Sequence, residues 1–156
     1  MSPVSPDVPN LRTLLLREHT ELNETFAALL VAVQADARVE CAELWSEFDT
    51  RLHAHMQLEE ELILPAFERE HPEQAARIRA EHATIRSTLL ELGIGVDLHF
   101  ARADVIERFV ALLRAHAGGE DRELYAWSQE HLAPETQSSV LDRLLGRLRR
   151  MPASIE

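Results

Sequence analysis

Apolar side chains recur every three or four positions along most of this chain, which is the spacing of helices that bury one face. Prolines and glycines are scarce inside these stretches, so the helices should be long. We predict helices over about residues 10–35, 39–70, 72–92, 101–131 and 134–150.

Residues with special backbone preferences mark the predicted boundaries. Asn10 suits the N-cap of the first helix, and Pro65 should kink the second helix near its end. Pro72 suits the first turn of the third helix, and Gly93 and Gly95 should end it.

Four long helices joined by short connections pack most simply with each helix antiparallel to the next. The predicted fold is therefore all-α: an antiparallel up-down-up-down four-helix bundle with a short C-terminal fifth helix. The 156 residues suit one domain, which we place at residues 10–150 between a flexible N-terminal arm (1–9) and a C-terminal tail (151–156).

Histidines interrupt the apolar stripes, one in each long predicted helix. They are His19, His55, His82 and His116. Two of them are followed four residues later by a glutamate, Glu59 and Glu120, and residues four apart lie on the same helix face. Counted from the predicted turns at about 1.5 Å per residue, the six side chains fall within about one helical turn of the same level.

Such a layer points to metal. An unpaired ionised carboxylate in a dry core costs several kcal/mol, and two facing carboxylates also repel each other. Two divalent cations between the carboxylates would compensate their charge and remove both costs. Imidazole and carboxylate ligands without thiolate suit iron, and six protein ligands leave positions open for water or oxygen on two six-coordinate ions.

Composition excludes other classes of function. Acidic residues outnumber basic ones 27 to 16, giving a formal net charge of −11, so neither a nucleic acid nor an anionic membrane is the expected partner. The single cysteine rules out a disulfide framework within the chain. The first residues lack the features of a signal peptide, and no apolar run approaches about 18 residues, so a cytoplasmic location is expected.

The segments around the four histidines resemble the hemerythrin-like (HHE cation-binding) family. The similar segments are Arg17–Leu22, His55–Pro65, Glu81–Arg86 and His116–Asp121. The resemblance implies a four-helix bundle that holds two irons joined by a bridging oxo or hydroxo group and by two carboxylates. His19, His55, His82 and His116 would be terminal ligands, and Glu59 and Glu120 the bridges.

The chain departs from the oxygen-carrying branch of that family at two places. That branch has two histidines one turn apart on its third helix, whereas Ile78 and Arg86 stand one turn either side of His82. One iron should therefore be a ligand short, which disfavours reversible oxygen carriage. The same branch uses an aspartate five residues after its last histidine, where Asp121 stands here. We favour Glu120, because a ligand at that spacing points about 140° away on a regular helix unless Gly118-Gly119 distorts it.

Three functions fit this site. The first is binding of oxygen or a related small diatomic ligand at an open iron position, for sensing, storage or scavenging. The alternative is a di-iron redox or stress-defence enzyme that acts on oxygen, peroxide or nitric oxide, and a third is a structural metal such as zinc. We interpret Tyr125, Trp45 and Trp127 as packing residues.

Overall fold

The computed structural model describes residues 10–97 and 103–150, and in these ranges the chain is helical almost throughout. The helices in chain order are α1 (Leu11–Gln34), α2 (Arg38–Leu58), η1 (Glu59–Ile63), α3 (Leu64–Glu70), α4 (Pro72–Asp97), α5 (Ala103–Gly119), η2 (Glu120–Leu124), α6 (Tyr125–His131) and α7 (Pro134–Arg150). The predicted arm at 1–9 and tail at 151–156 lie outside the described residues.

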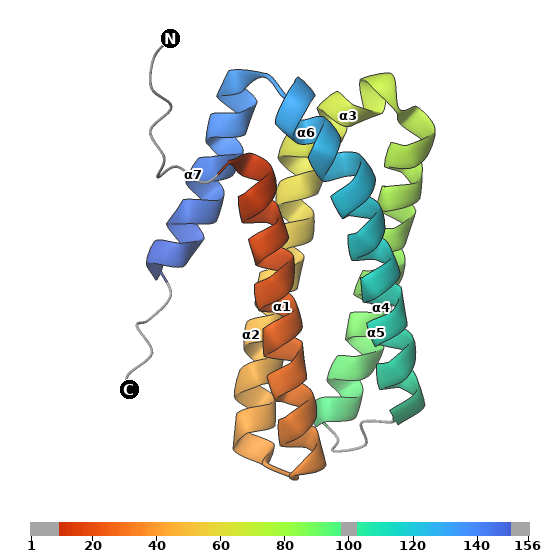
Figure 1. Ribbon diagram of the computed structural model, residues 1–156. Coiled ribbons are helices and arrows are strands. Elements are labelled where there is room, and N and C mark those ends of the chain that lie inside the picture. Colours follow the sequence, from red (N-terminus) through yellow and green to blue (C-terminus); the bar gives the residue numbers. More distant parts are fainter. Residues whose placement is uncertain (1–9, 98–102, 151–156) are drawn as a thin grey trace.

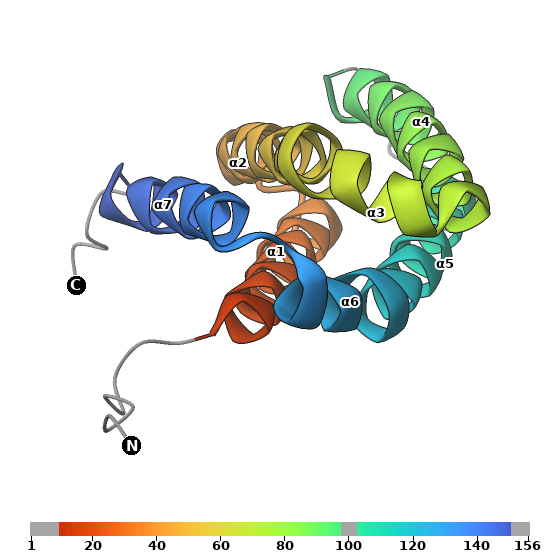
Figure 2. The ribbon, with the colours of Figure 1, turned by 90° about the horizontal axis from the view of Figure 1, so that it is seen from above.

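The four long rods are α1, α2 with η1 and α3, α4, and α5 with η2 and α6 (Figure 1). Seen from above, they surround a common axis, and α7 lies outside them, where it contacts α1 and η1 (Figure 2). The predicted all-α bundle with a short C-terminal helix is confirmed. None of the described helices is both long enough and apolar enough to cross a membrane.

Local chemistry explains the helix ends, with one correction. Asn10 caps α1 as predicted, because its Oδ1 accepts a hydrogen bond from the backbone N–H of Thr13 at 2.8 Å. The prediction that Gly93 and Gly95 end the third helix is wrong, since α4 continues to Asp97. Gly93 serves a close approach instead: a Cβ there would lie 3.1 Å from Cζ2 of Trp45.

Two of the four rods contain a π-helical segment of five residues, in which one extra residue is inserted into the helix. The backbone N–H of Leu64 donates to the carbonyl of Glu59, and that of Tyr125 donates to the carbonyl of Glu120. Pro65 contributes to the first segment, because it has no N–H to offer the carbonyl four residues before it. Both segments begin at a glutamate of the predicted site.

The apolar core consists of two clusters, which the predicted site separates. One cluster contains Leu11, Leu15, Leu64, Phe67, Tyr125 and Val140 among others. The other contains Leu22, Phe26, Phe48, Ile85 and Phe109 among others. Along their rods, His19, His82, His116 and Glu120 lie between the two groups, and His55 and Glu59 lie where the second group gives way to the first.

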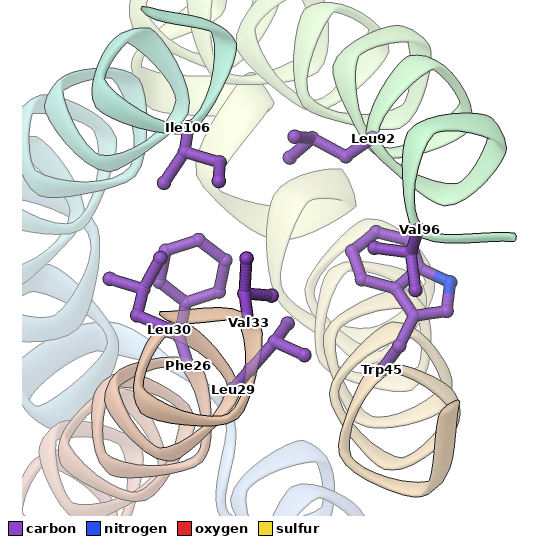
Figure 3. A pocket seen from close by; sticks show the side chains of 8 residues that line it. All are labelled: Phe26, Leu29, Leu30, Val33, Trp45, Leu92, Val96 and Ile106. Carbon is purple, nitrogen blue, oxygen red and sulfur yellow. The ribbon is translucent and has the colours of Figure 1, made fainter. Parts of the chain in front are cut away.

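The second cluster includes a small cavity of about 10 Å³ towards the end of the bundle opposite α3 and α6 (Figure 3). It is lined by Phe26, Leu29, Leu30, Val33, Trp45, Leu92, Val96 and Ile106. A cavity of this size with apolar walls offers no site for a polar ligand.

Candidate metal centre

The structure brings the six side chains of the predicted site together between the two apolar clusters. His19 comes from α1, His55 from α2, Glu59 from η1, His82 from α4, His116 from α5 and Glu120 from η2. Five of them are buried, and 11% of the His19 side chain is exposed.

These side chains form two groups whose nitrogen and oxygen atoms lie within 4.8 Å of one another. We call the first group, His19, His55 and Glu120, the His19–His55 half. The second group, Glu59, His82, His116 and Glu120, is the His82–His116 half. Glu120 belongs to both groups, which is the position of a carboxylate that bridges two ions.

In the His82–His116 half, Nε2 of both histidines and the oxygens of both glutamates are close together but have no hydrogen-bond partner. Nε2 of His82 lies 3.6 Å from Oε1 of Glu59 and 3.7 Å from Oε2 of Glu120. Nε2 of His116 lies 2.9 Å from Oε1 of Glu120, yet neither atom is aligned for a hydrogen bond. Buried polar atoms are almost always satisfied, so this group fits a set of ligands around an ion rather than a hydrogen-bond network.

The His19–His55 half brings two imidazole nitrogens face to face. Nε2 of His19 lies 3.1 Å from Nε2 of His55, which in turn lies 3.1 Å from Oε1 of Glu59. The hydroxyl of Tyr125 lies 2.8 Å from the first nitrogen and 3.0 Å from the second. Glu59 therefore approaches both halves, as the second bridging carboxylate should.

Carboxylates on the outer side of the histidines determine which ring nitrogen faces inward. Nδ1 of His55 lies 3.0 Å from Glu18, and Nδ1 of His116 lies 2.7 Å from Glu81. Nδ1 of His19 lies 3.0 Å from Asp121. A carboxylate at Nδ1 accepts the N–H of that nitrogen and leaves the lone pair of Nε2 free for a metal.

This arrangement leaves too few protons in the His19–His55 half when both rings are neutral. Both Nε2 atoms are then acceptors 3.1 Å apart, and the single O–H of Tyr125 can donate to only one of them. Either an added proton or a cation must lie between the nitrogens. A metal ion satisfies both lone pairs at once.

The buried carboxylates raise the pKa values of the neighbouring histidines. Burial opposes the charged ring, but Glu120 and then Glu81 raise the pKa of His116 to about 9. Burial likewise opposes charge on His55, yet Glu59 and Glu18 raise its pKa well above the ordinary value. Burial and the charge of Glu120 raise the pKa of Glu59. The site thus binds positive charge strongly, whether as protons or as metal.

A cavity of about 30 Å³ adjoins the centre on the side of the second apolar cluster. Its walls include His19, His55, His116 and Glu120 together with Phe48, Leu52, Met56 and Leu113. The volume exceeds the roughly 10–15 Å³ that one water requires. A small ligand therefore has room beside the polar atoms.

Sequence reasoning missed two features of the centre. Tyr125 does pack in the core as predicted, but its hydroxyl also reaches the site. The outer carboxylates were not predicted in that role, although Glu18 and Glu81 each directly precede a site histidine in the sequence. Of the two alternatives for the last bridge, Glu120 faces the site, whereas Asp121 supports His19 from outside.

The comparisons with known proteins agree with this geometry. Residues 10–128 match the family model of the hemerythrin HHE cation binding domain, which covers the four rods up to Ser128. The curated proteins and the solved structures give no match to the chain.

Proposed function

Because this chain belongs to the hemerythrin HHE cation-binding family, we propose that it is a non-haem di-iron protein that binds oxygen or a related small diatomic ligand. The observation that carries the proposal is the pair of buried ligand groups that share Glu120. One ion per group gives two ions per chain, with one carboxylate common to both.

The residues present fit such a centre. Seven buried nitrogen and oxygen atoms of Glu59, His82, His116 and Glu120 lack hydrogen-bond partners. Ions would satisfy all of them except Nδ1 of His82, which lies 3.5 Å from Glu60. Terminal ligation would come from His19, His55, His82 and His116, and bridging from Glu59 and Glu120. When bound, two irons with an oxo or hydroxo bridge supply an open coordination position and redox chemistry.

The donor set favours iron over its competitors. It combines imidazole with carboxylate and contains no thiolate; Cys41, the single cysteine, lies outside the ligand groups. Zinc prefers closed four-coordinate sites in structural roles, whereas these groups, with their shared carboxylate, suit two ions of higher coordination number. The adjoining cavity of about 30 Å³ has room for a diatomic ligand.

The residues around the centre orient its histidines and limit the access of water to it. Glu18, Glu81 and Asp121 orient three of the imidazoles from outside. Phe48, Leu52 and Met56 line the adjoining cavity with apolar surface, which limits the water beside a bound ligand.

Metal analysis combined with anaerobic spectroscopy tests the proposal. Protein loaded with iron(II) without air should contain about two irons per chain, as the two ligand groups require. Oxygen or nitric oxide should then change the visible spectrum, and removing the gas should restore it. Spectral change that does not reverse, with turnover of peroxide or nitric oxide, would favour the redox enzyme. Purified protein that contains only zinc and does not respond to either gas would contradict the proposal.

A further inference from the structure

Tyr125 is the only tyrosine of the chain, and it is fully buried at the centre. Its hydroxyl contacts one imidazole nitrogen from each of two other rods, His19 on α1 and His55 on α2. A hydrogen bond from the single O–H satisfies one of these nitrogens and leaves the other without a proton, whereas a metal ion could contact the oxygen and both nitrogens.

The three atoms are spaced like neighbouring ligands of one ion. The triangle formed by the Tyr125 hydroxyl, Nε2 of His19 and Nε2 of His55 has edges of 2.8, 3.0 and 3.1 Å. Ligands at right angles around an ion at about 2.1 Å lie about 3.0 Å apart. One ion can therefore contact all three atoms without rearrangement of the side chains.

The π-helical segment η2 explains how Tyr125 reaches this place. On a regular helix at about 100° per residue, a residue nine positions after His116 would face about 180° away from it. The extra residue in η2 changes this direction. The hydrogen bond from the Tyr125 N–H to the Glu120 carbonyl sets Tyr125 one turn beyond Glu120 on the side of the site.

We propose that Tyr125 is a ligand of the metal ion in the His19–His55 half, bound through its phenolate oxygen. This inference rests on the proposed function, since it assumes that the centre holds metal. On binding, the O–H bond breaks, a metal–oxygen bond forms, and the proton leaves to solvent; no electron is transferred. Phenolate is an anionic oxygen donor, and its charge helps to balance that of the ion.

The ligand sets of the two halves then differ. The His19–His55 half has two imidazoles, the carboxylates and the phenolate, whereas the His82–His116 half has only two imidazoles and the carboxylates. The cavity of about 30 Å³ borders both halves, with His19 and His55 of one half and His116 of the other in its walls, so it does not by itself assign an external ligand to either ion.

Absorption spectroscopy of the iron(III) protein tests this ligand directly. The wild type should show a visible phenolate-to-iron charge-transfer band, which must come from Tyr125 because the chain has one tyrosine. Tyr125→Phe should lose the band, measured per bound iron, and should keep the fold. Ser128→Ala is the matched control. It removes a buried hydroxyl that donates a hydrogen bond to the Leu124 carbonyl, and it should keep the band.

Zinc provides a second readout that needs no redox chemistry. A phenol, whose ordinary pKa is about 10, carries its proton at neutral pH unless a bound cation displaces it. Zinc added at neutral pH should therefore produce the ultraviolet difference spectrum of one tyrosinate, and should do so in the wild type but not in Tyr125→Phe.

The two proposals fail in distinguishable ways. A protein with about two bound irons and no phenolate band overturns the role of Tyr125 and leaves the di-iron proposal intact. A phenolate-like band that persists in Tyr125→Phe likewise overturns it. A wild-type protein that binds neither iron nor zinc overturns both.

Discussion

The two halves of the centre repeat one plan with different side chains. In each half a glutamate reaches across to the histidine of the next rod: Glu18 to His55 at 3.0 Å and Glu81 to His116 at 2.7 Å. In each of the two π-helical segments the glutamate at the first position faces the site. The plan therefore has an approximate two-fold relation, and the deviations from it indicate where the halves are specialised.

Two deviations separate the halves. The position after each π-helical segment's fifth residue holds Tyr125 in one rod and Leu64 in the other, so only one half gains a hydroxyl. The second difference is in the outer carboxylates. Asp121 lies 3.0 Å from His19, whereas the equivalent Glu60 lies 3.5 Å from His82 and forms a closer ion pair with Arg86. His82 is thus the least firmly oriented of the four histidines.

The largest expected effect comes from removing what the halves share. Glu120→Ala takes one carboxylate from both ligand groups, and we expect bound iron to fall from about two per chain to less than one. Zinc affinity should fall by more than the roughly 100-fold that changes outside the ligand set can cause. Glu123→Gln, in the same segment but paired with Arg77 at the surface, is the control and should bind metal normally. Metal analysis and calorimetric titration measure both.

Two single variants, each of which removes one imidazole from a different half, test whether the halves differ in metal affinity. His116→Ala leaves its half with one imidazole and no phenol, whereas His19→Ala leaves His55 and Tyr125. We therefore expect His116→Ala to lose more metal, and its content and melting temperature to fall together because metal binding stabilises the fold. Equal losses in the two variants would contradict the asymmetry. Wild-type metal content in His116→Ala would contradict its assignment as a ligand.

The outer carboxylates should show smaller and nearly equal effects. Glu18→Gln and Glu81→Gln keep the shape of each side chain but weaken its hold on Nδ1 of His55 or His116. Each should lower zinc affinity by about 10–100-fold with little loss of stoichiometry at saturating metal. Titration calorimetry compares the two. A large loss of zinc affinity in only one variant would show that the two outer glutamates do not contribute equally to metal binding.

The smallest expected effect is a dependence on pH. The pKa of His116 is about 9 in the folded, metal-free protein and 6.5 in the reference state. Its contribution to stability is therefore complete below about pH 6.5 and is lost as the pH rises through about 9. The raised pKa values of His19 and His55 act in the same direction.

Metal reverses this trend, because its ligands must lose their protons before they bind. The difference in melting temperature between zinc-loaded and metal-free protein should widen between about pH 6.5 and 9. Glu120, whose pKa is held well below 4.5, affects stability only at more acidic pH. A constant difference across this range would mean that protons and metal do not compete for the site.

The sequence was sufficient for the parts of this centre that follow regular helical spacing. His55 and Glu59, or His116 and Glu120, lie four residues apart, so their common direction follows from helix geometry alone. The rods that carry them follow from the apolar stripes and a few breakers such as Pro72 and Pro134.

The remaining features depend on departures from that spacing. Tyr125 faces the site only because η2 inserts one residue, and no turn residue in the sequence marks such an insertion. The glycine at position 93 predicts a helix end, whereas in the structure it accommodates Trp45 from another rod. The apolar pattern of one helix does not reveal such a tertiary contact. Glu18 and Glu81 bind histidines on neighbouring rods rather than the ones beside them in the chain, so their partners depend on packing.

The position of the polar layer between two apolar clusters has a mechanical consequence. Bound ions would link all four rods at the polar layer, so we expect local unfolding that starts at either end of the bundle to stop there. Without them, we expect each cluster to open on its own. Amide hydrogen exchange should then quicken separately around Phe67 and around Phe109, turning one cooperative unit into two.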